Sequence, residues 1–133
     1  MSKPVILCVD DEVVVLDSLK IQLKKAFDNN YYFEGAESAN EALELIEELR
    51  DEGRDIIVIV SDWLMPGLNG DEFLSLVHAK FPNVVKIMLT GQADPEAIER
   101  AKVRANLHCC LPKPWDAREL IAAINTGVAK IYK

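Results

Sequence analysis

Residues 56–62 of the chain read Ile56-Ile57-Val58-Ile59-Val60-Ser61-Asp62. Five β-branched residues in succession favour an extended backbone, because branching at Cβ restricts a side chain in a helix and suits a pleated surface. The run is apolar throughout, which is typical of a strand covered on both faces. It therefore predicts the central strand of a parallel sheet, with Asp62 just beyond its apolar part.

Other apolar segments alternate with segments whose hydrophobic residues recur at helical spacing, as Leu16, Leu19 and Leu23 do. Strands that alternate with amphipathic helices are typical of an α/β fold with a parallel sheet. The segment 31–36 is less uniformly apolar than the others, which suits a strand at the edge of the sheet. The expected strands are 5–9, 31–36, 56–60, 84–89 and 107–111.

Each expected strand is followed by an expected helix, so the chain reads as five strand–helix units. Right-handed crossovers and a reversal of winding beside the first strand give a doubly wound five-stranded parallel sheet, most simply ordered 2-1-3-4-5. The fourth helix should begin at Asp94 and Pro95 and end near Ala105. Its apolar stripe is thin, so we expect this helix to be held loosely.

The bulk properties of the chain narrow its class. With 133 residues, it should form one domain over residues 1–133. Its apolar runs are shorter than the roughly 20 residues of a membrane span, and the start lacks a signal-peptide pattern, so we expect a cytoplasmic protein without membrane contact. Three cysteines make no disulfide framework. The net charge of −7 disfavours direct nucleic-acid binding and favours protein partners.

Polar residues stand where the expected strands end. Asp10 and Asp11 follow the first strand, Asp62 the third and Thr90 the fourth, while Lys113 comes just past the fifth. Ligands of a doubly wound sheet bind beyond the carboxyl ends of its strands, near the point where the winding reverses. We therefore expect these five residues to meet at one edge of the sheet.

The five residues suggest a specific chemistry. Three carboxylates and one ammonium leave a charge near −2, which favours a bound cation, and oxygen ligands select a hard ion such as Mg²⁺. A carboxylate beside such an ion can attack phosphorus and form an aspartyl phosphate. Lys113 would then neutralise charge on the transferred group, and the Thr90 hydroxyl could donate a hydrogen bond to it. Each residue alone would have an ordinary structural explanation, such as a turn or a surface lysine.

Four motifs together resemble the receiver domain of two-component response regulators, the family that includes chemotaxis receivers. The resemblance runs essentially end to end and implies a flavodoxin-like (βα)5 fold. The motifs are Val9-Asp10-Asp11, Ser61-Asp62-Trp63-Leu64-Met65-Pro66-Gly67, Leu89-Thr90-Gly91 and Leu111-Pro112-Lys113-Pro114-Trp115.

The resemblance implies roles for individual residues. Asp62 would accept a phosphoryl group from a sensor histidine kinase, a phosphotransferase or a small acyl phosphate. Asp11, Asp62 and the backbone carbonyl of Leu64 would ligate Mg²⁺ directly, and Asp10 mainly through water. Lys113 would contact the phosphoryl group, and the bond between Lys113 and the following proline would be cis.

The resemblance also implies a switch rather than an enzyme, because the domain would catalyse only its own phosphorylation and dephosphorylation. A downstream protein or attached output domain would bind the face made by the fourth helix, fifth strand and fifth helix. Thr90 and Cys110 occupy the switch positions. Receivers often carry an aromatic residue where Cys110 stands, and a thiol cannot repeat the large movement of an aromatic ring. Gly91 replaces a common alanine and gives the following loop more backbone freedom.

Two other functions are compatible with such a sheet. A small phosphatase with an aspartyl nucleophile is disfavoured, because Leu64 stands where a second aspartate would serve as general acid. A nucleotide or flavin carrier is disfavoured, because no glycine-rich loop follows the first strand and Asp10-Asp11 would repel phosphate. Trp63, next to Asp62, is expected at the rim of the site.

Overall fold

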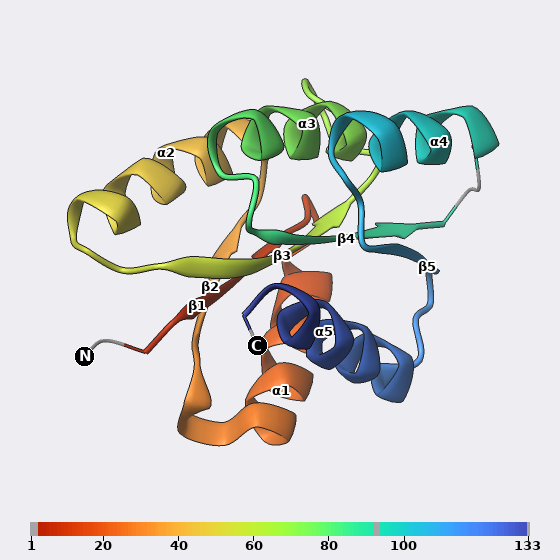
Figure 1. Ribbon diagram of the computed structural model, residues 1–133. Helices are drawn as coiled ribbons and strands as arrows, with labels where there is room; N and C mark the ends of the chain where they lie inside the picture. The colour runs from red at the N-terminus through yellow and green to blue at the C-terminus, as the bar shows by residue number, and fades with distance from the viewer. Residues whose placement is uncertain (1–2, 92–93, 133) are drawn as a thin grey trace.

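The sheet in the computed structural model has five parallel strands in the order β2-β1-β3-β4-β5 (Figure 1). The structure describes residues 3–91 and 94–132. The strand order confirms the prediction, with the apolar β3 at the centre and the more polar β2 at an edge. The strands are β1 (Val5–Val9), β2 (Tyr32–Ala36), β3 (Ile56–Asp62), β4 (Val85–Thr90) and β5 (Cys109–Pro112).

Helices cover both faces of the sheet. Figure 1 shows α2, α3 and α4 on one face and α1 and α5 on the other. This is the doubly wound α/β arrangement that the sequence predicted. The helices are α1 (Val13–Phe27), α2 (Ala39–Asp51), α3 (Gly70–Lys80), α4 (Pro95–Arg104) and α5 (Ala117–Ile131), and a 3-10 turn (Asp28–Asn30) follows α1.

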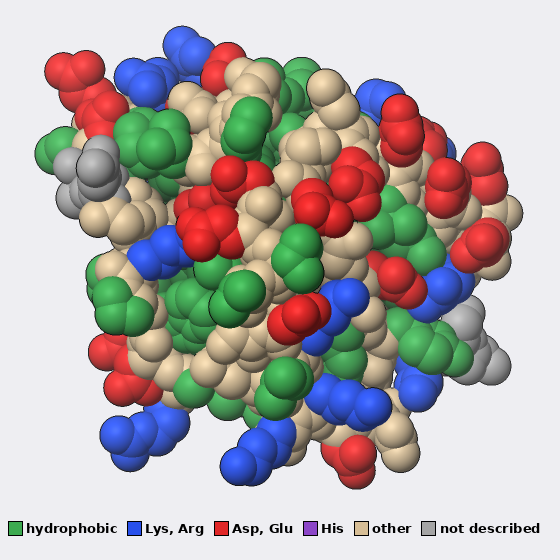
Figure 2. Space-filling model, turned by 180° about the vertical axis from the view of Figure 1, so that it is seen from behind, with side chains coloured by type: hydrophobic (Ala, Val, Ile, Leu, Met, Phe, Trp, Pro, Cys, Tyr) green, Lys and Arg blue, Asp and Glu red, His purple; other side chains and the backbone are tan. Residues whose placement is uncertain are grey.

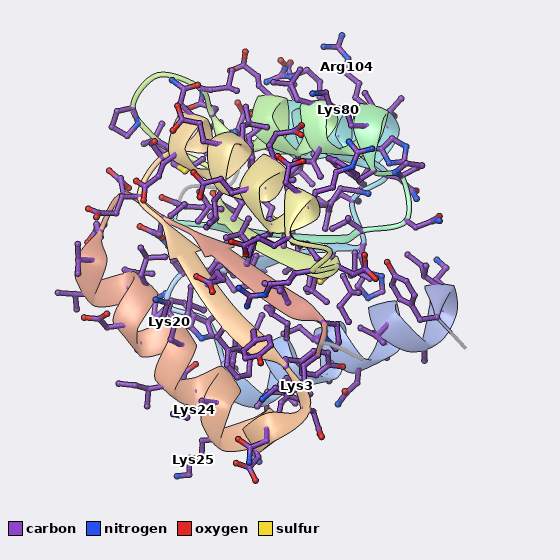
Figure 3. All side chains as sticks on the ribbon, turned by 90° about the vertical axis from the view of Figure 1, so that its left-hand side faces the viewer. Lys3, Lys20, Lys24, Lys25, Lys80 and Arg104 are labelled. Atoms are coloured by element: carbon purple, nitrogen blue, oxygen red, sulfur yellow. The ribbon has the colours of Figure 1, made fainter. Side chains whose placement is uncertain are left out.

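Charged side chains cover much of the surface. Figure 2 shows acidic side chains spread over one broad face with lysine and arginine side chains among them. Figure 3 shows Lys20, Lys24 and Lys25 along α1. The last two stand in the final turn of that helix, where positive charge complements the helix dipole. Within the described residues, no helix is long and apolar enough to span a bilayer.

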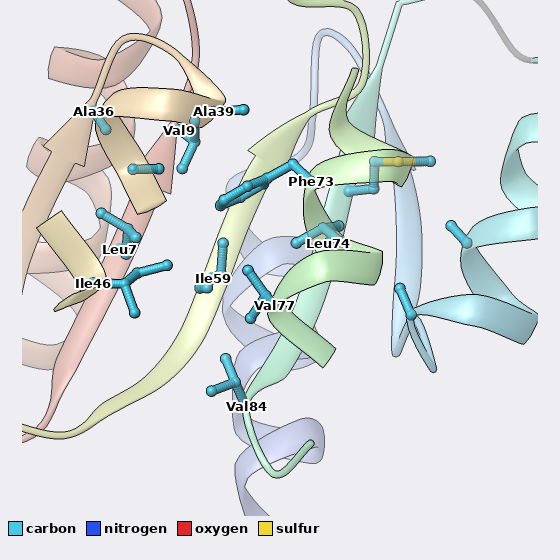
Figure 4. Packing of buried hydrophobic residues seen from close by; sticks show 14 of the residues in the cluster. Leu7, Val9, Ala36, Ala39, Ile46, Ile59, Phe73, Leu74, Val77 and Val84 are labelled. Atoms are coloured by element: carbon cyan, nitrogen blue, oxygen red, sulfur yellow. The ribbon is translucent and has the colours of Figure 1, made fainter. Parts of the chain in front are cut away.

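The hydrophobic core has two layers because the strands alternate their side chains between the two faces. On one face, Phe73, Leu74 and Val77 of α3 pack against Ile59 of β3 (Figure 4). On the other, Val58 and Val60 belong to a second cluster with the apolar stripes of α1 and α5. The central strand is thus buried on both sides, as its unbroken apolar run predicted.

Aspartate side chains cap two of the helices, and the cap of α4 is one that the sequence predicted. The Asp94 carboxylate accepts hydrogen bonds from the backbone N–H groups of Glu96 and Ala97, and Pro95 takes the first position of α4. Asp116 caps α5 in the same way. These caps fix where the two helices begin after the loops that leave the site edge.

The start of β5 differs from the prediction. The strand begins at Cys109 rather than at residue 107. Asn106 adopts a left-handed conformation with φ of 51°, and the Leu107 N–H donates to the Ala101 carbonyl at 3.2 Å. Leu107 therefore closes the end of α4 and packs in the core before the ladder starts. Burial of an apolar residue alone could not distinguish these two roles.

Candidate functional site

Three carboxylates gather at the edge where β1 and β3 end. Asp10, Asp11 and Asp62 each offer an oxygen that lies within 4.8 Å of the others. Asp10 is fully buried, Asp62 is 6% exposed and Asp11 is exposed. Asp62 is at least 51 residues from the other two in the chain. The three meet because β1 and β3 are neighbours in the sheet.

Lys113 brings a positive charge into this cluster from beyond β5. Its Nζ atom lies 2.8 Å from Asp10 Oδ2 and 3.2 Å from Asp62 Oδ1. The Lys113–Pro114 peptide bond is cis, as the resemblance implied. Two of the three carboxylates thus share one ammonium, and the four groups carry a formal charge of −2 when all are ionised.

The charges perturb each other's protonation. Burial raises the pKa of Asp62 above its ordinary value, and the charge of Asp10 raises it further, although Lys113 opposes both effects. For Lys113, burial lowers the pKa, but the hydrogen bond to Asp10 and the charge of Asp62 outweigh it, so the pKa is raised. The site therefore keeps its lysine charged and favours added positive charge near Asp62.

Backbone hydrogen bonds fix the acidic residues at the strand ends. The Asp10 N–H donates to the Ala36 carbonyl at 3.1 Å, and the Asp10 side chain accepts from the Glu12 N–H at 2.9 Å. Past β3, the Trp63 N–H donates to the Leu89 carbonyl at 2.9 Å. These hydrogen bonds extend the pairing of neighbouring strands into the loops, and they hold the site side chains in place.

Thr90 and Leu64 lie at the borders of the cluster. Thr90 ends β4 and is buried, one residue past the register partner of Asp62. Its carbonyl accepts from the Lys113 N–H at 2.9 Å, which ties the ends of β4 and β5 together. Leu64 stands in the turn after β3 with its side chain exposed. Its carbonyl as a metal ligand stays a prediction.

Cys110 lies on the α4 side of the sheet, where it packs against the cluster that includes Met88 and Ala101. Cys109 belongs to the opposite cluster, so the two thiols alternate faces as expected for a strand. An open groove beside α4 is lined by Thr90, Ile98, Lys102, Cys110 and Lys113, among others. The two expected switch positions therefore border one groove.

Two features near Asp62 were not predicted from the sequence. Gly70 begins α3 directly against the Asp62 backbone, and a Cβ atom there would collide with the Asp62 carbonyl oxygen and come within 2.9 Å of Trp63 Cα. Close packing therefore requires a glycine at this position. Asp71 is also buried and accepts a hydrogen bond from Trp63 Nε1 at 3.0 Å. No local sequence pattern identifies that contact.

The donor set suits a hard divalent cation. The three candidate ligands are carboxylate oxygens, which Mg²⁺ prefers over nitrogen or sulfur. The net negative charge and the raised pKa of Asp62 both favour a cation at this place. Asp11 is exposed, so an ion could reach the cluster from solvent while keeping water ligands.

Comparisons with known proteins agree with this fold. A family model described as the response regulator receiver domain matches residues 6–125. The hydrogenase transcriptional regulatory protein HoxA of Cupriavidus necator is 33% identical over 123 residues, which are 92% of this chain and 24% of HoxA. The transcriptional regulatory protein CpxR homolog of Haemophilus influenzae is 36% identical over 126 residues, 93% of this chain and 49% of that protein. The chain thus spans about a quarter and about half of these relatives.

A solved structure shows the same architecture over almost the whole chain. The signal receiver domain of an HD domain-containing protein from Pseudomonas fluorescens Pf-5 matches with a TM-score of 0.87 and 28% identity, covering 98% of both chains. Its likeness extends over all five strand–helix units of the present chain. With the family match over residues 6–125, this shows that the chain belongs to the response regulator receiver domain family of two-component signal transduction.

Proposed function

We propose that this receiver domain is a phosphorylation switch in which Asp62 accepts the phosphoryl group. The observation that carries the proposal is the position of the Asp62 carboxylate, which shares the acidic cluster with Asp10 and Asp11 and lies 3.2 Å from Lys113 Nζ. A carboxylate held between a cation site and an ammonium can approach an anionic donor that it would otherwise repel.

Asp11, Asp62 and the Leu64 carbonyl are proposed as direct Mg²⁺ ligands, with Asp10 acting mainly through water. When bound, Mg²⁺ supplies positive charge that offsets the acidic cluster and the incoming phosphoryl oxygens. The buried Asp10 also accepts from the Glu12 N–H and pairs with Lys113. These contacts fix the Asp10 carboxylate, which is proposed to position Lys113 and a water molecule that binds the Mg²⁺ ion.

In the transfer, an Asp62 oxygen forms the new bond to phosphorus. The bond from phosphorus to the donor nitrogen of a phosphohistidine, or to the donor oxygen of an acyl phosphate, breaks and the electron pair leaves with the donor. Lys113 neutralises charge on the transferred group, and the Thr90 hydroxyl donates to one of its oxygens. In dephosphorylation water attacks the phosphorus and releases Asp62, so the domain acts chemically only on itself.

The proposed partners are proteins. A sensor histidine kinase or phosphotransferase supplies the phosphoryl group in the cytoplasm, and a downstream protein or attached output domain binds the face of α4, β5 and α5. Phosphorylation shifts an equilibrium between two conformations that already exist and changes affinity at that face. The groove beside Cys110, which has Thr90 at its border, supports this choice of face.

Intact-mass measurement after incubation with acetyl phosphate and Mg²⁺ tests the proposal. We expect one added phosphoryl group in the wild type, none in Asp62→Asn, and one in the control Asp55→Asn, which changes an exposed aspartate away from the site. Uptake by Asp62→Asn equal to that of the wild type would assign the modification to another residue and refute the proposal.

A further inference from the structure

We propose that Asp71 is a positioning residue that links the backbone beside Asp62 to helix α4, through Trp63 on one side and Arg100 on the other. The inference rests on the proposed phosphorylation of Asp62. It assigns to this chain a path between the site and α4 that does not pass through residue 110.

The two oxygens of Asp71 bind groups from two different elements. Oδ1 accepts from Trp63 Nε1 at 3.0 Å, and Oδ2 pairs with Arg100 Nε at 3.5 Å. Trp63 lies in the turn after β3, Asp71 in the first turn of α3, and Arg100 in the middle of α4. One side chain therefore bridges three segments that the sequence places 8 and 29 residues apart.

The Trp63 end of this bridge is fixed to the site. Trp63 directly follows Asp62, its N–H bonds to the Leu89 carbonyl, and its carbonyl accepts from the Gly70 N–H at 2.6 Å. Gly70 in turn packs so closely on the Asp62 backbone that no Cβ atom fits between them. Residue 62, the Trp63 indole and the first turn of α3 must therefore shift together.

The Arg100 end is weaker and can be released. The Asp71 side chain is 8% exposed, whereas that of Arg100 is 44% exposed and its contact is a single long one. A half-exposed guanidinium can exchange this partner for water at little cost, while the buried carboxylate keeps its bond to Trp63. Movement of Trp63 would thus first lengthen or break the contact between Asp71 and Arg100.

Helix α4 is sensitive to such a change because apolar packing holds it only lightly. Its buried residues are two alanines, Ala97 and Ala101, which bury little area each. One polar contact therefore contributes a larger share of the interactions that orient α4. Its loss would matter less for a helix such as α3, which is anchored by buried leucine and phenylalanine side chains. The ordinary alternative is that Asp71 serves only the dipole of α3 and the packing of Trp63.

The experiment uses the Trp115→Phe background, in which Trp63 is the single remaining tryptophan. Into it go Asp71→Asn, Arg100→Ala and Arg100→Lys, together with Arg104→Ala as the matched control. Arg104 lies one turn further along α4 and extends away from the protein (Figure 3). It lines, with Asp71 and Arg100, a groove between α3 and α4 that is separate from the groove beside Cys110. Within residues 3–91 and 94–132, no ion pair involves Arg104. Each protein is measured with Mg²⁺, before and after acetyl phosphate.

Three readouts separate the possible outcomes: intact mass for phosphate uptake, Trp63 emission for the indole, and hydrogen exchange of the α4 amides. We expect full phosphate uptake in every variant and a phosphate-dependent change of α4 exchange in the background and in Arg104→Ala. That change should be about fivefold smaller in Arg100→Ala and Asp71→Asn, and partly restored in Arg100→Lys. In Arg100→Ala the Trp63 emission should still respond, because the bond from Asp71 to the indole remains.

The outcomes that overturn the inference are distinct from failure of the proposed function. Normal phosphate uptake with an undiminished α4 response in Arg100→Ala and Asp71→Asn refutes the link, as does an equal loss in Arg104→Ala. No phosphate uptake in the background protein refutes the proposed function, and the link falls with it. A purely structural role of Asp71 would alter the exchange before phosphate is added and leave the phosphate-dependent change intact.

Discussion

The ammonium group of Lys113 lies 2.8 Å from the fully buried carboxylate of Asp10, although 103 residues separate them in the chain. The pair joins the end of β1 to the loop after β5, across the whole half of the sheet that contains β3 and β4. The contact is thus a tertiary link as well as part of the site, and its removal should affect stability before any ligand is present.

Lys113→Met should destabilise the metal-free protein by about 3 kcal/mol, because it leaves Asp10 and Asp62 as buried carboxylates without their shared cation. Urea unfolding at pH 7 measures the change. Lys102→Met, at the exposed rim of the neighbouring groove, is the control and should alter stability by less than about 0.5 kcal/mol. If Lys113→Met lost no more stability than Lys102→Met, the ion pairs of Lys113 with Asp10 and Asp62 would contribute nothing to the stability of the fold.

Asp62→Asn should stabilise the metal-free protein at pH 7. The pKa of Asp62 is raised in the folded state, so the folded protein binds the proton more tightly than the unfolded chain, and ionised Asp62 opposes folding. The gain from asparagine should therefore be greatest above the folded-state pKa and shrink as the pH falls through it. Thermal unfolding between pH 4 and 8 gives the profile, with the exposed Asp17→Asn as reference. If the stability gained by Asp62→Asn grew as the pH fell, the pKa of Asp62 could not be raised in the folded state.

Mg²⁺ should stabilise the wild type and act less on Asp11→Asn. A ligand that binds only the folded state at 100 times its dissociation constant adds about 2.7 kcal/mol. Asp11 is exposed, so its replacement should leave the metal-free fold nearly unchanged while removing one proposed ligand. Thermal unfolding in Mg²⁺ and in K⁺ of equal ionic strength separates binding from screening. Equal shifts for the two proteins would exclude Asp11 as a ligand.

Lys86→Met should stabilise the protein at neutral pH. Lys86 is 1% exposed in β4, and burial lowers its pKa from 10.5 to about 8. Below pH 8 the lysine is charged in both states, and the pKa difference corresponds to a cost of about 3 kcal/mol for the folded one. The wild type should recover this cost between pH 8 and 10.5, so the advantage of methionine should fall over that range. A constant advantage from pH 7 to 10.5, or one as large for the exposed Lys24→Met, would show that charge burial is not its cause.

The sequence was sufficient for the strand order and for the meeting of the acidic residues with Lys113, because apolar runs locate the strands and general crossover rules order them. The run 56–60 is apolar without alternation, so it had to be central, and parallel strands bring their carboxyl ends to one edge. Asp10, Asp62 and Lys113 could therefore be placed together from the sequence alone, and the structure confirms their contacts. The roles of these residues in phosphoryl transfer stay predictions.

The features that escaped prediction depend on space rather than on pattern. A lysine within a strand suggests a solvent-facing side chain, yet Lys86 is buried because β4 is covered on both faces. Its Nζ donates to the Val84 carbonyl at 2.7 Å near the start of the strand. The bridge from Asp71 to Arg100 joins two helices, and an aspartate in a first helical turn has an ordinary explanation in the helix dipole.

The contact of Gly70 with the Asp62 backbone has a mechanical consequence. It places the pivot of α3 at the proposed nucleophile, and 11 residues at about 1.5 Å each put the far end of the helix about 16 Å away. A small tilt at the pivot is therefore magnified along this lever. If α3 tilted about Gly70, Lys80 would move furthest, and its ammonium lies 3.3 Å from Glu47 of α2. Such a tilt would therefore reach α2, a helix that lies away from the acidic cluster, through this ion pair.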